Sequence, residues 1–195
     1  MKPVETGPEQ AKRERENRRK QNGGANLNLL KDFTKEEKSW MLYDWANSAH
    51  SVIVVTILPI FFNTVASYTK DAVSSMSAWG YATSLAMAIV ALAAPILGAF
   101  GDFAGLRKKL FGVFLALGCL SCLLLGATPL SDFTDPALAD KMAGIILGLY
   151  ILSTVGFAGA NLYYDSFLSD VTTDERMDRV STMGYGLGYL GGSTI

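Results

Sequence analysis

Residues 98–110 decide how the chain folds, and they read Gly98-Ala99-Phe100-Gly101-Asp102-Phe103-Ala104-Gly105-Leu106-Arg107-Lys108-Lys109-Leu110. This polar stretch separates two apolar runs, residues 72–101 and 110–131, which contain no Asp, Glu, Lys or Arg. Because a helix of about 20 apolar residues spans the hydrocarbon of a bilayer, each run predicts a membrane-spanning helix. The stretch itself must then be a tight turn outside the hydrocarbon, with glycines for the sharp bend and basic residues that hold it on one side.

The rest of the chain repeats this pattern of apolar runs divided by short polar segments. Half of the residues are hydrophobic and only 18% are charged. Four runs longer than about 20 residues disfavour a soluble protein with buried helices. We therefore predict an all-α, polytopic membrane helical bundle with four full spans and the start of a fifth. The predicted spans are residues 41–66, 78–100, 110–129, 142–164 and 181–195.

The first 38 residues differ in composition from everything that follows. They are rich in charged and amide side chains, and ten of the 17 basic residues precede residue 40. Such a segment has too few large apolar side chains to order itself, so residues 1–38 are predicted to be a disordered polar tail and residues 39–195 a transmembrane domain. Four interleaved glutamates weaken the case for nucleic-acid binding, so contact with anionic headgroups is the preferred interpretation and no nucleic-acid partner is expected.

The basic residues also predict an orientation. If the N-terminus lies inside, the inner segments carry fifteen Lys and Arg residues, and the outer loops carry only Lys70 and Lys141. Basic residues accumulate in cytoplasmic loops, so the tail and the 98–110 turn are expected to be cytoplasmic.

The first span opens with polar side chains. At helical spacing Asp44, Asn47, Ser48 and Ser51 share one face, and His50 lies beside it. An ionised group near the membrane centre costs about 2.5–3.5 kcal/mol, so such groups usually face a cavity or a partner. Asp44, Asn47, Ser48 and His50 are the predicted substrate or proton pathway. Two alternatives stay open: Asp44 caps the helix, or His50 makes an ordinary interhelical hydrogen bond.

Small residues four apart recur in the later spans, which favours close helix packing in lipid. A surface on which helices slide during transport is a compatible interpretation. The residues are Gly144 and Gly148, Gly156 and Ala160, and Gly184, Gly188 and Gly192. Cys119 and Cys122 have the spacing of a redox or metal pair, but they lie in an apolar run without further ligands nearby. We interpret them as packing residues and expect no metal site and no cofactor.

The 98–110 turn resembles the signature loop of the major facilitator superfamily, Gly-x-x-x-Asp-(Arg/Lys)-x-Gly-(Arg/Lys)-(Arg/Lys). The residues that match this loop are Gly98, Asp102, Gly105, Arg107 and Leu110. Phe103 and Leu106 stand where the superfamily usually has a basic residue. The resemblance implies a cytoplasmic loop between helices 2 and 3.

The resemblance also implies a latch that closes the cytoplasmic side, with Asp102 as its acidic residue. We add Asp165, at the inner end of the fourth span, as a residue that helps Asp102 and Arg107 to latch the cytoplasmic side shut. The predicted cytoplasmic gate comprises Gly98, Asp102, Gly105, Arg107 and Asp165. Arg176 and Arg179 are further candidate partners. The alternative is that Asp165 and Asp170 cap helix ends and face water.

Three further motifs are similar to the vacuole-effluxer-like family, which is related to the autophagy-associated amino-acid effluxer of yeast vacuoles. They are Tyr-Asp-Trp-Ala-Asn-Ser-Ala at 43–49, Asn-Leu-Tyr-Tyr-Asp-Ser-Phe-Leu-Ser-Asp at 161–170, and the glycine-rich run at 184–192. The resemblance implies a twelve-helix transporter of amino acids or related metabolites. Because the sequence stops within the fifth predicted span, we expect an N-terminal fragment of a longer protein.

These observations predict a secondary transporter that moves small solutes across the membrane by alternating access, with efflux as the expected type of transport. The expected partners are a small-molecule solute, a coupling proton, the lipid bilayer and the other half of the same transporter. The bacterial inner membrane is the expected location, with the vacuolar membrane as the alternative. A membrane structural or assembly protein without transport is the alternative function. An enzyme is not expected, because one histidine without a matching carboxylate cluster is too little for catalysis.

Overall fold

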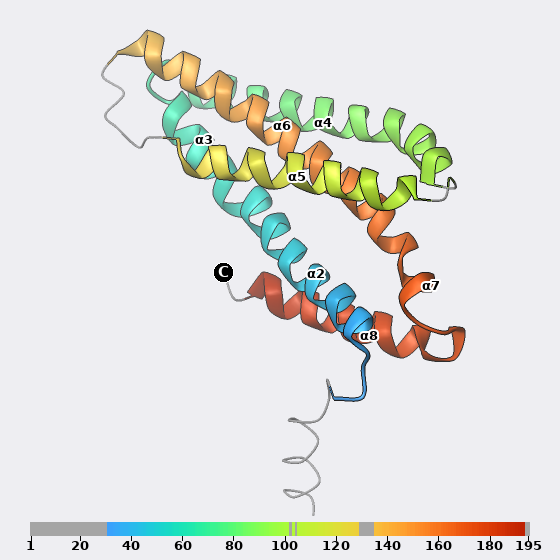
Figure 1. Ribbon diagram of the computed structural model, residues 1–195. Helices are drawn as coiled ribbons and strands as arrows, with labels where there is room; N and C mark the ends of the chain where they lie inside the picture. Colours follow the sequence, from blue (N-terminus) through green and yellow to red (C-terminus); the bar gives the residue numbers. More distant parts are fainter. Residues whose placement is uncertain (1–30, 102, 104, 129–134, 194–195) are drawn as a thin grey trace, which may run out of the picture.

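The computed structural model describes residues 31–101, 103, 105–128 and 135–193, and every regular element in them is helical. The helices are arranged as a bundle of long rods (Figure 1). In chain order they are α2 (Lys35–Val52), η1 (Ile53–Ile57), α3 (Leu58–Ala66), α4 (Ala72–Gly101), α5 (Leu106–Gly126), α6 (Pro136–Ser166), α7 (Leu168–Val171) and α8 (Asp174–Ser193).

Four helices in the described residues are long and apolar enough to cross a bilayer. They are Lys35–Ala66, which comprises α2, η1 and α3, together with Ala72–Gly101, Leu106–Gly126 and Pro136–Ser166. The shortest has 21 residues, and at about 1.5 Å per residue this length covers the hydrocarbon thickness of about 30 Å. The predicted all-α, polytopic membrane bundle is confirmed. α4 and α6 each begin six residues before the predicted span, because a helix can continue past the edge of the hydrocarbon.

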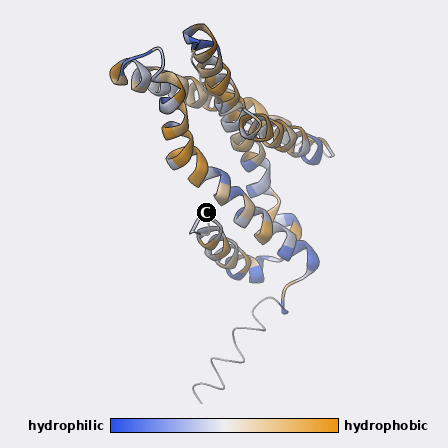
Figure 2. Cartoon of the chain, turned by 90° about the vertical axis from the view of Figure 1, so that its left-hand side faces the viewer, coloured by the Kyte–Doolittle hydropathy of each residue, from blue (hydrophilic) through white to orange (hydrophobic). Residues whose placement is uncertain are grey.

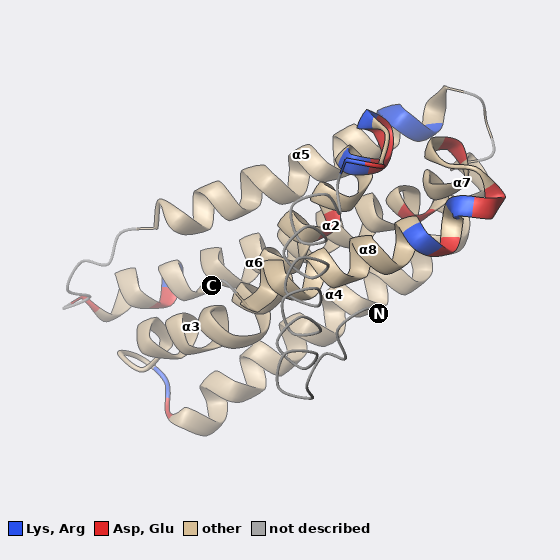
Figure 3. Cartoon of the chain, turned by 90° about the horizontal axis from the view of Figure 1, so that it is seen from below, with Lys and Arg blue, Asp and Glu red and all other residues tan. Residues whose placement is uncertain are grey.

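Charged residues gather at the two ends of the bundle, and few lie between them (Figure 3). Figure 2 shows the complementary pattern, with hydrophobic residues along the helices and hydrophilic ones near their ends. We call the end that holds the first turns of α2, α5 and α8 the basic end. At the opposite end, Lys70 forms an ion pair with Asp140. Consecutive long helices therefore run in opposite directions between two polar zones.

A capping box at the start of α2 explains why this helix begins at Lys35, within the predicted tail of residues 1–38. Thr34 accepts a hydrogen bond from the Glu37 backbone N–H at 3.2 Å, and the Glu37 side chain accepts one from the Thr34 N–H at 2.8 Å. This reciprocal capping box satisfies two amide donors of the first turn. Residues 35–38, which were assigned to the tail, are thus the first turn of a membrane helix. The tail up to residue 30 lies outside the described residues.

The middle of the first span contains a wide turn. In η1 the Leu58 N–H donates to the Ile53 carbonyl, five residues back. Pro59 follows directly, and a proline has no N–H and a ring that crowds the preceding turn, which a wider turn relieves. The Thr56 hydroxyl donates to the Val52 carbonyl at 2.6 Å. Hydroxyls of this kind re-satisfy backbone groups that an irregular turn leaves unpaired inside a membrane.

Two apolar clusters hold the long helices together. In the first, Trp79 of α4 stacks on Tyr150 of α6 with 4.4 Å between ring centroids, and the Tyr150 hydroxyl donates to Thr83 at 3.1 Å. The buried members of this cluster are Leu58, Phe62, Val65, Ala66, Ala82, Ala139, Ala143, Ile146 and Tyr150. The second cluster lies near the basic end, and its buried members are Phe33, Trp40, Met41, Tyr164 and Val180.

α5 and α6 lie backbone against backbone at Gly156. A Cβ at this position would lie 2.5 Å from the Gly118 nitrogen and 2.9 Å from the Phe114 carbonyl oxygen. Both neighbours are backbone, so neither can move aside without separating the helices. Gly144 and Gly148, which were predicted to form a similar contact, have nothing within 4 Å of an added Cβ.

We expect Gly156→Ala to lower the free energy of unfolding by about 1–3 kcal/mol, the usual cost of overpacking a tight contact. Gly148→Ala is the matched control. Its Cβ meets open space, and Ala favours a helix over Gly by about 1 kcal/mol, so its stability should be unchanged or raised. Thermal unfolding of both variants in detergent, followed by circular dichroism, measures the difference. Equal stability of the two variants would contradict the close approach.

Candidate functional site

The predicted polar stripe of the first span is divided between two sides of α2. Asp44, Ser48 and Ser51 line a hollow of about 540 Å³ shared with α8. His50 lines a different hollow, on the side of α5 and α6. Asn47 lies between the two groups on the helix surface. Asp44, Ser48 and Ser51 thus border one hollow, and His50, which helical spacing places beside their face, stacks on Phe157 of α6 instead.

Asp44 lies inside the helix and is not its cap. The capping residue of α2 is Thr34, so the capping alternative for Asp44 is wrong. A Cβ at Gly188 of α8 would lie 2.7 Å from Asp44 Oδ2 and 3.0 Å from Ser48 Oγ. The glycine therefore leaves space for the carboxylate between the two helices. Replacing it would force the carboxylate and the helix apart.

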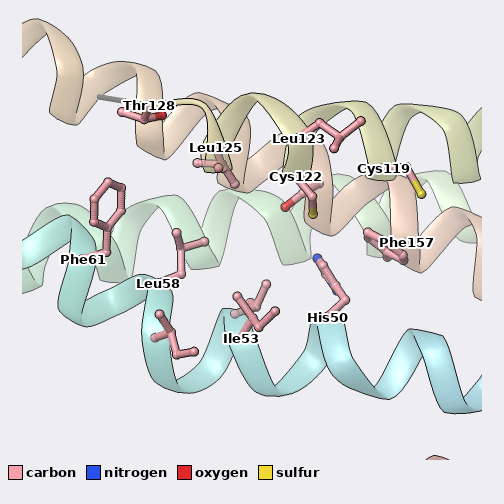
Figure 4. A pocket seen from close by; sticks show the side chains of 14 residues that line it. His50, Ile53, Leu58, Phe61, Cys119, Cys122, Leu123, Leu125, Thr128 and Phe157 are labelled. Atoms are coloured by element: carbon pink, nitrogen blue, oxygen red, sulfur yellow. The ribbon is translucent and has the colours of Figure 1, made fainter. Parts of the chain in front are cut away.

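The hollow beside His50 has a volume of about 670 Å³ and an apolar lining (Figure 4). Figure 4 shows the His50 side chain pointing from α2 toward Cys122 of α5. The imidazole stacks on Phe157 of α6, with 3.8 Å between ring centroids and 24° between planes. The lining residues are His50, Ile53, Val54, Ile57, Leu58, Phe61, Cys119, Cys122, Leu123, Leu125, Gly126, Thr128, Ser153 and Phe157.

Two buried polar atoms on this side of α2 have no hydrogen-bond partner in the described part of the chain. They are Asn47 Oδ1 and His50 Nε2. One turn before Asn47, the Tyr43 hydroxyl donates to Asn161 Oδ1 of α6 at 3.2 Å. An unpaired buried polar group costs about 1–3 kcal/mol, so both atoms are suited to a polar ligand that supplies the missing bond. Both could accept a hydrogen bond, and an imidazole can also take up a proton.

Cys119 and Cys122 are free thiols that line the same hollow. Three or more His, Cys, Asp or Glu side chains do not come together at any point in the described ranges in a way that could hold a metal ion. The two thiols therefore line the hollow beside His50 as small, polarizable and weakly polar side chains.

The turn between α4 and α5 contains a backbone conformation that favours glycine. Gly105 is the N-terminal cap residue of α5 and has a φ of 82°, a left-handed conformation that side chains disfavour. Gly98, by contrast, is exposed, and an added Cβ there would meet nothing within 4 Å. Asp102 lies outside the described residues.

Arg107 binds Asp170 of α7, not Asp165. Its guanidinium forms an ion pair with Asp170, donates to the Ser166 carbonyl at 3.4 Å and lies 5.1 Å from the centroid of Phe167. Asp165 is exposed and forms no ion pair with another described residue. One turn of chain separates the two aspartates, so the spacing could not distinguish them.

Glu37 is a buried carboxylate that the sequence reasoning missed. It is 1% exposed. Arg176 donates to it twice, from Nε to Oε1 at 3.0 Å and from Nη2 to Oε2 at 2.8 Å, and the Thr172 hydroxyl donates to Oε1 at 2.7 Å. The hydrogen bond to Glu37 raises the pKa of the Arg176 guanidinium above its usual value. The Thr34-x-x-Glu37 spacing of a capping box was the available signal.

Phe33 completes this junction, which we call the Glu37 clasp: Asp32, Phe33, Thr34, Glu37, Thr172, Arg176 and Arg179. The guanidinium carbons of Arg176 and Arg179 lie 5.8 and 5.1 Å from the buried Phe33 ring centroid. Arg179 also pairs with Asp32 at 3.3 Å. The two arginines thus bind the start of α2 and are not partners of Asp165. The clasp joins the start of α2 to the start of α8 at the basic end.

We expect Glu37→Gln to lower the free energy of unfolding by about 1.5–3 kcal/mol, the range for hydrogen bonds to a charged group. The amide keeps the size of the carboxylate but loses its charge and one acceptor oxygen. Glu36→Gln is the matched control, because Glu36 is exposed and its neutralisation should leave stability unchanged. Chemical unfolding in detergent measures both variants. If E37Q is as stable as E36Q, the clasp does not stabilise the α2–α8 pair.

Comparison with known proteins adds to this geometry. Residues 3–195 match the family model of the Major Facilitator Superfamily. The chain is 41% identical over 169 residues to YxiO of Bacillus subtilis (strain 168), described as an uncharacterized MFS-type transporter. The aligned part is 86% of this chain and 37% of that protein, so the chain spans well under half of the relative's length. No solved structure matches the chain.

Proposed function

The chain belongs to the major facilitator superfamily, and on that premise we propose that it forms part of a secondary transporter that moves a small solute by alternating access. This superfamily consists of transporters rather than enzymes. Four membrane-spanning helices make the chain a multi-pass membrane protein.

The observation that carries the proposal is the pair of unpaired polar atoms, Asn47 Oδ1 and His50 Nε2, inside an apolar membrane helix. They lie just before the wide turn η1, which begins at Ile53. Wide turns in membrane helices recur at functional sites, and polar groups inside the membrane usually face a substrate or ion pathway. A solute that passes along α2 would supply the hydrogen bonds that Asn47 Oδ1 and His50 Nε2 lack within the described part of the chain.

We propose amino acids or related metabolites as the cargo and export as the direction. The motif at 43–49 and its likeness to the vacuole-effluxer-like family support this class. The hollow shared with α8 suits the ammonium group of an amino acid, because Asp44 and Ser48 line it. His50 lines the separate, apolar hollow on the other side of α2. His50 and Asp44 are the groups that could carry a coupling proton.

The gate is proposed at the basic end, from Gly98, Asp102, Gly105, Arg107 and Asp165. Asp170 joins this set, since it holds Arg107. The ion pair ties the start of α5 to the segment that follows α6. A latch between these elements and the other half of the transporter would open and close the cytoplasmic side.

We expect Asn47→Leu and His50→Phe each to reduce solute flux about tenfold or more, the effect of losing one good hydrogen bond to the cargo. Flux is measured with labelled amino acids in vesicles that contain the full-length protein. Stability should stay the same or rise, because each change removes an unpaired buried polar group. If Asn47 and His50 had only a structural role, both variants would be less stable than the unaltered protein.

Thr64→Val is the matched control for these variants. Thr64 is exposed, and its hydroxyl donates only to the Ile60 carbonyl of its own helix. Its flux should equal that of the unaltered protein. If N47L and H50F both transport normally, the pathway is wrong. If another solute is transported, only the amino-acid class fails, and if no solute is transported, the structural or assembly alternative gains support.

The N-terminus is proposed to be cytoplasmic, in a bacterial inner membrane. The excess of basic residues on the inner segments supports this orientation. We expect a cysteine at position 108 to react with impermeant thiol reagent only from the cytoplasmic side, and a cysteine at position 141 only from the outside. Cys119 and Cys122 are first replaced by Ala, so that neither contributes signal. Labelling of both positions from one side would contradict the alternating path of the helices.

A further inference from the structure

A third hollow lies at the basic end, away from the pathway proposed above. It has a volume of about 680 Å³ and lies between α2 and α5, over the end of α6 and α7. Lys35 and Lys108 border it from the first turns of α2 and α5. Farther along the same helices its walls are aromatic and apolar, with Trp40 and Phe111 among them. The hollow therefore has a cationic entrance and an apolar interior.

The two lysines are available to a ligand. Neither forms an ion pair within the described part of the chain. Two acidic residues also border the hollow, but Asp170 is neutralised by Arg107, which leaves Glu36 alone against two ammonium groups. The first turn of α5 adds positive potential, because no side chain caps it.

The interior selects against a free anion. Phe111 lies between Tyr43 and Phe167, with ring centroids 5.3 and 5.5 Å away. Trp40 already donates its indole N–H to the Tyr164 carbonyl at 3.2 Å, so it presents an apolar surface. A soluble phosphate would leave this wall uncovered. A ligand that joins a phosphate to a hydrocarbon chain would use both parts.

We propose that this hollow binds an anionic phospholipid, with its phosphate between Lys35 and Lys108 and the first part of an acyl chain against Phe111 and Leu115. The position suits the ligand, since the lysines lie at the polar end of two membrane helices and the aromatic wall lies deeper. Basic pockets between membrane helices at a charged surface bind the headgroups of anionic lipids. The bound lipid fills the space between α2 and α5 next to the Arg107–Asp170 pair.

The test measures thermal unfolding of the detergent-purified, full-length protein with added phosphatidylglycerol, phosphatidylcholine or glycerol phosphate. Phosphatidylglycerol should raise the unfolding midpoint, and the other two should not. K35Q/K108Q should weaken the apparent affinity for phosphatidylglycerol about thirtyfold, since each basic residue contributes about a fivefold factor at a membrane surface. The control K38Q/K109Q removes the same charge from the neighbouring turns and should keep the affinity.

Three results would overturn the proposal. They are an unchanged affinity in K35Q/K108Q, an equal response to phosphatidylcholine, and an equal response to glycerol phosphate, which would indicate a site for soluble anions. If K35Q/K108Q does not fold, Ser39→Trp decides. Ser39 is exposed and borders the hollow, so the indole fills the space while both lysines remain. S39W should lose the response to phosphatidylglycerol, and a normal response would also reject the site.

Discussion

Hydrocarbon offers no water to a backbone amide, a carboxylate or a guanidinium, and the arrangement of this chain follows from that constraint. Its spanning segments are helices, which satisfy their own backbone groups. Its charges lie at the ends of those helices, where water and headgroups can solvate them. Where a charge is buried, as at Glu37, it receives several donors at once. Asp44 is the exception inside a helix, and a glycine on α8 leaves space for it.

The helix α2 contributes residues to all three hollows described above. One side packs on α8, and another faces α5 and α6. The Glu37 clasp fixes its first turn to the start of α8, and the wide turn η1 interrupts it near mid-length. Polar side chains on both sides therefore open into different hollows.

The unpaired atoms of Asn47 and His50 cost stability, and folding alone gives no reason to keep them. Proteins commonly accept such local costs at sites of function. The hollow at the basic end, in contrast, contains no such unpaired atom among the side chains described above. Its walls include packed aromatic rings and its border carries two lysines, so the proposed lipid would add stability there. The proposed cargo pathway and the proposed lipid site thus lie on the same helix with different energetic roles.

The sequence by itself determined the helical class, the four spans and the superfamily resemblance of residues 98–110, because hydropathy and turn chemistry are local properties. It also identified Gly105, whose left-handed backbone is required by a short turn. Only the tertiary structure decided that the polar stripe is divided, that Arg107 binds Asp170, and that Arg176 binds Glu37. The last pair is 139 residues apart. Helical spacing says which side chains share a face, but the neighbour that covers each face is set by the packing of the whole bundle.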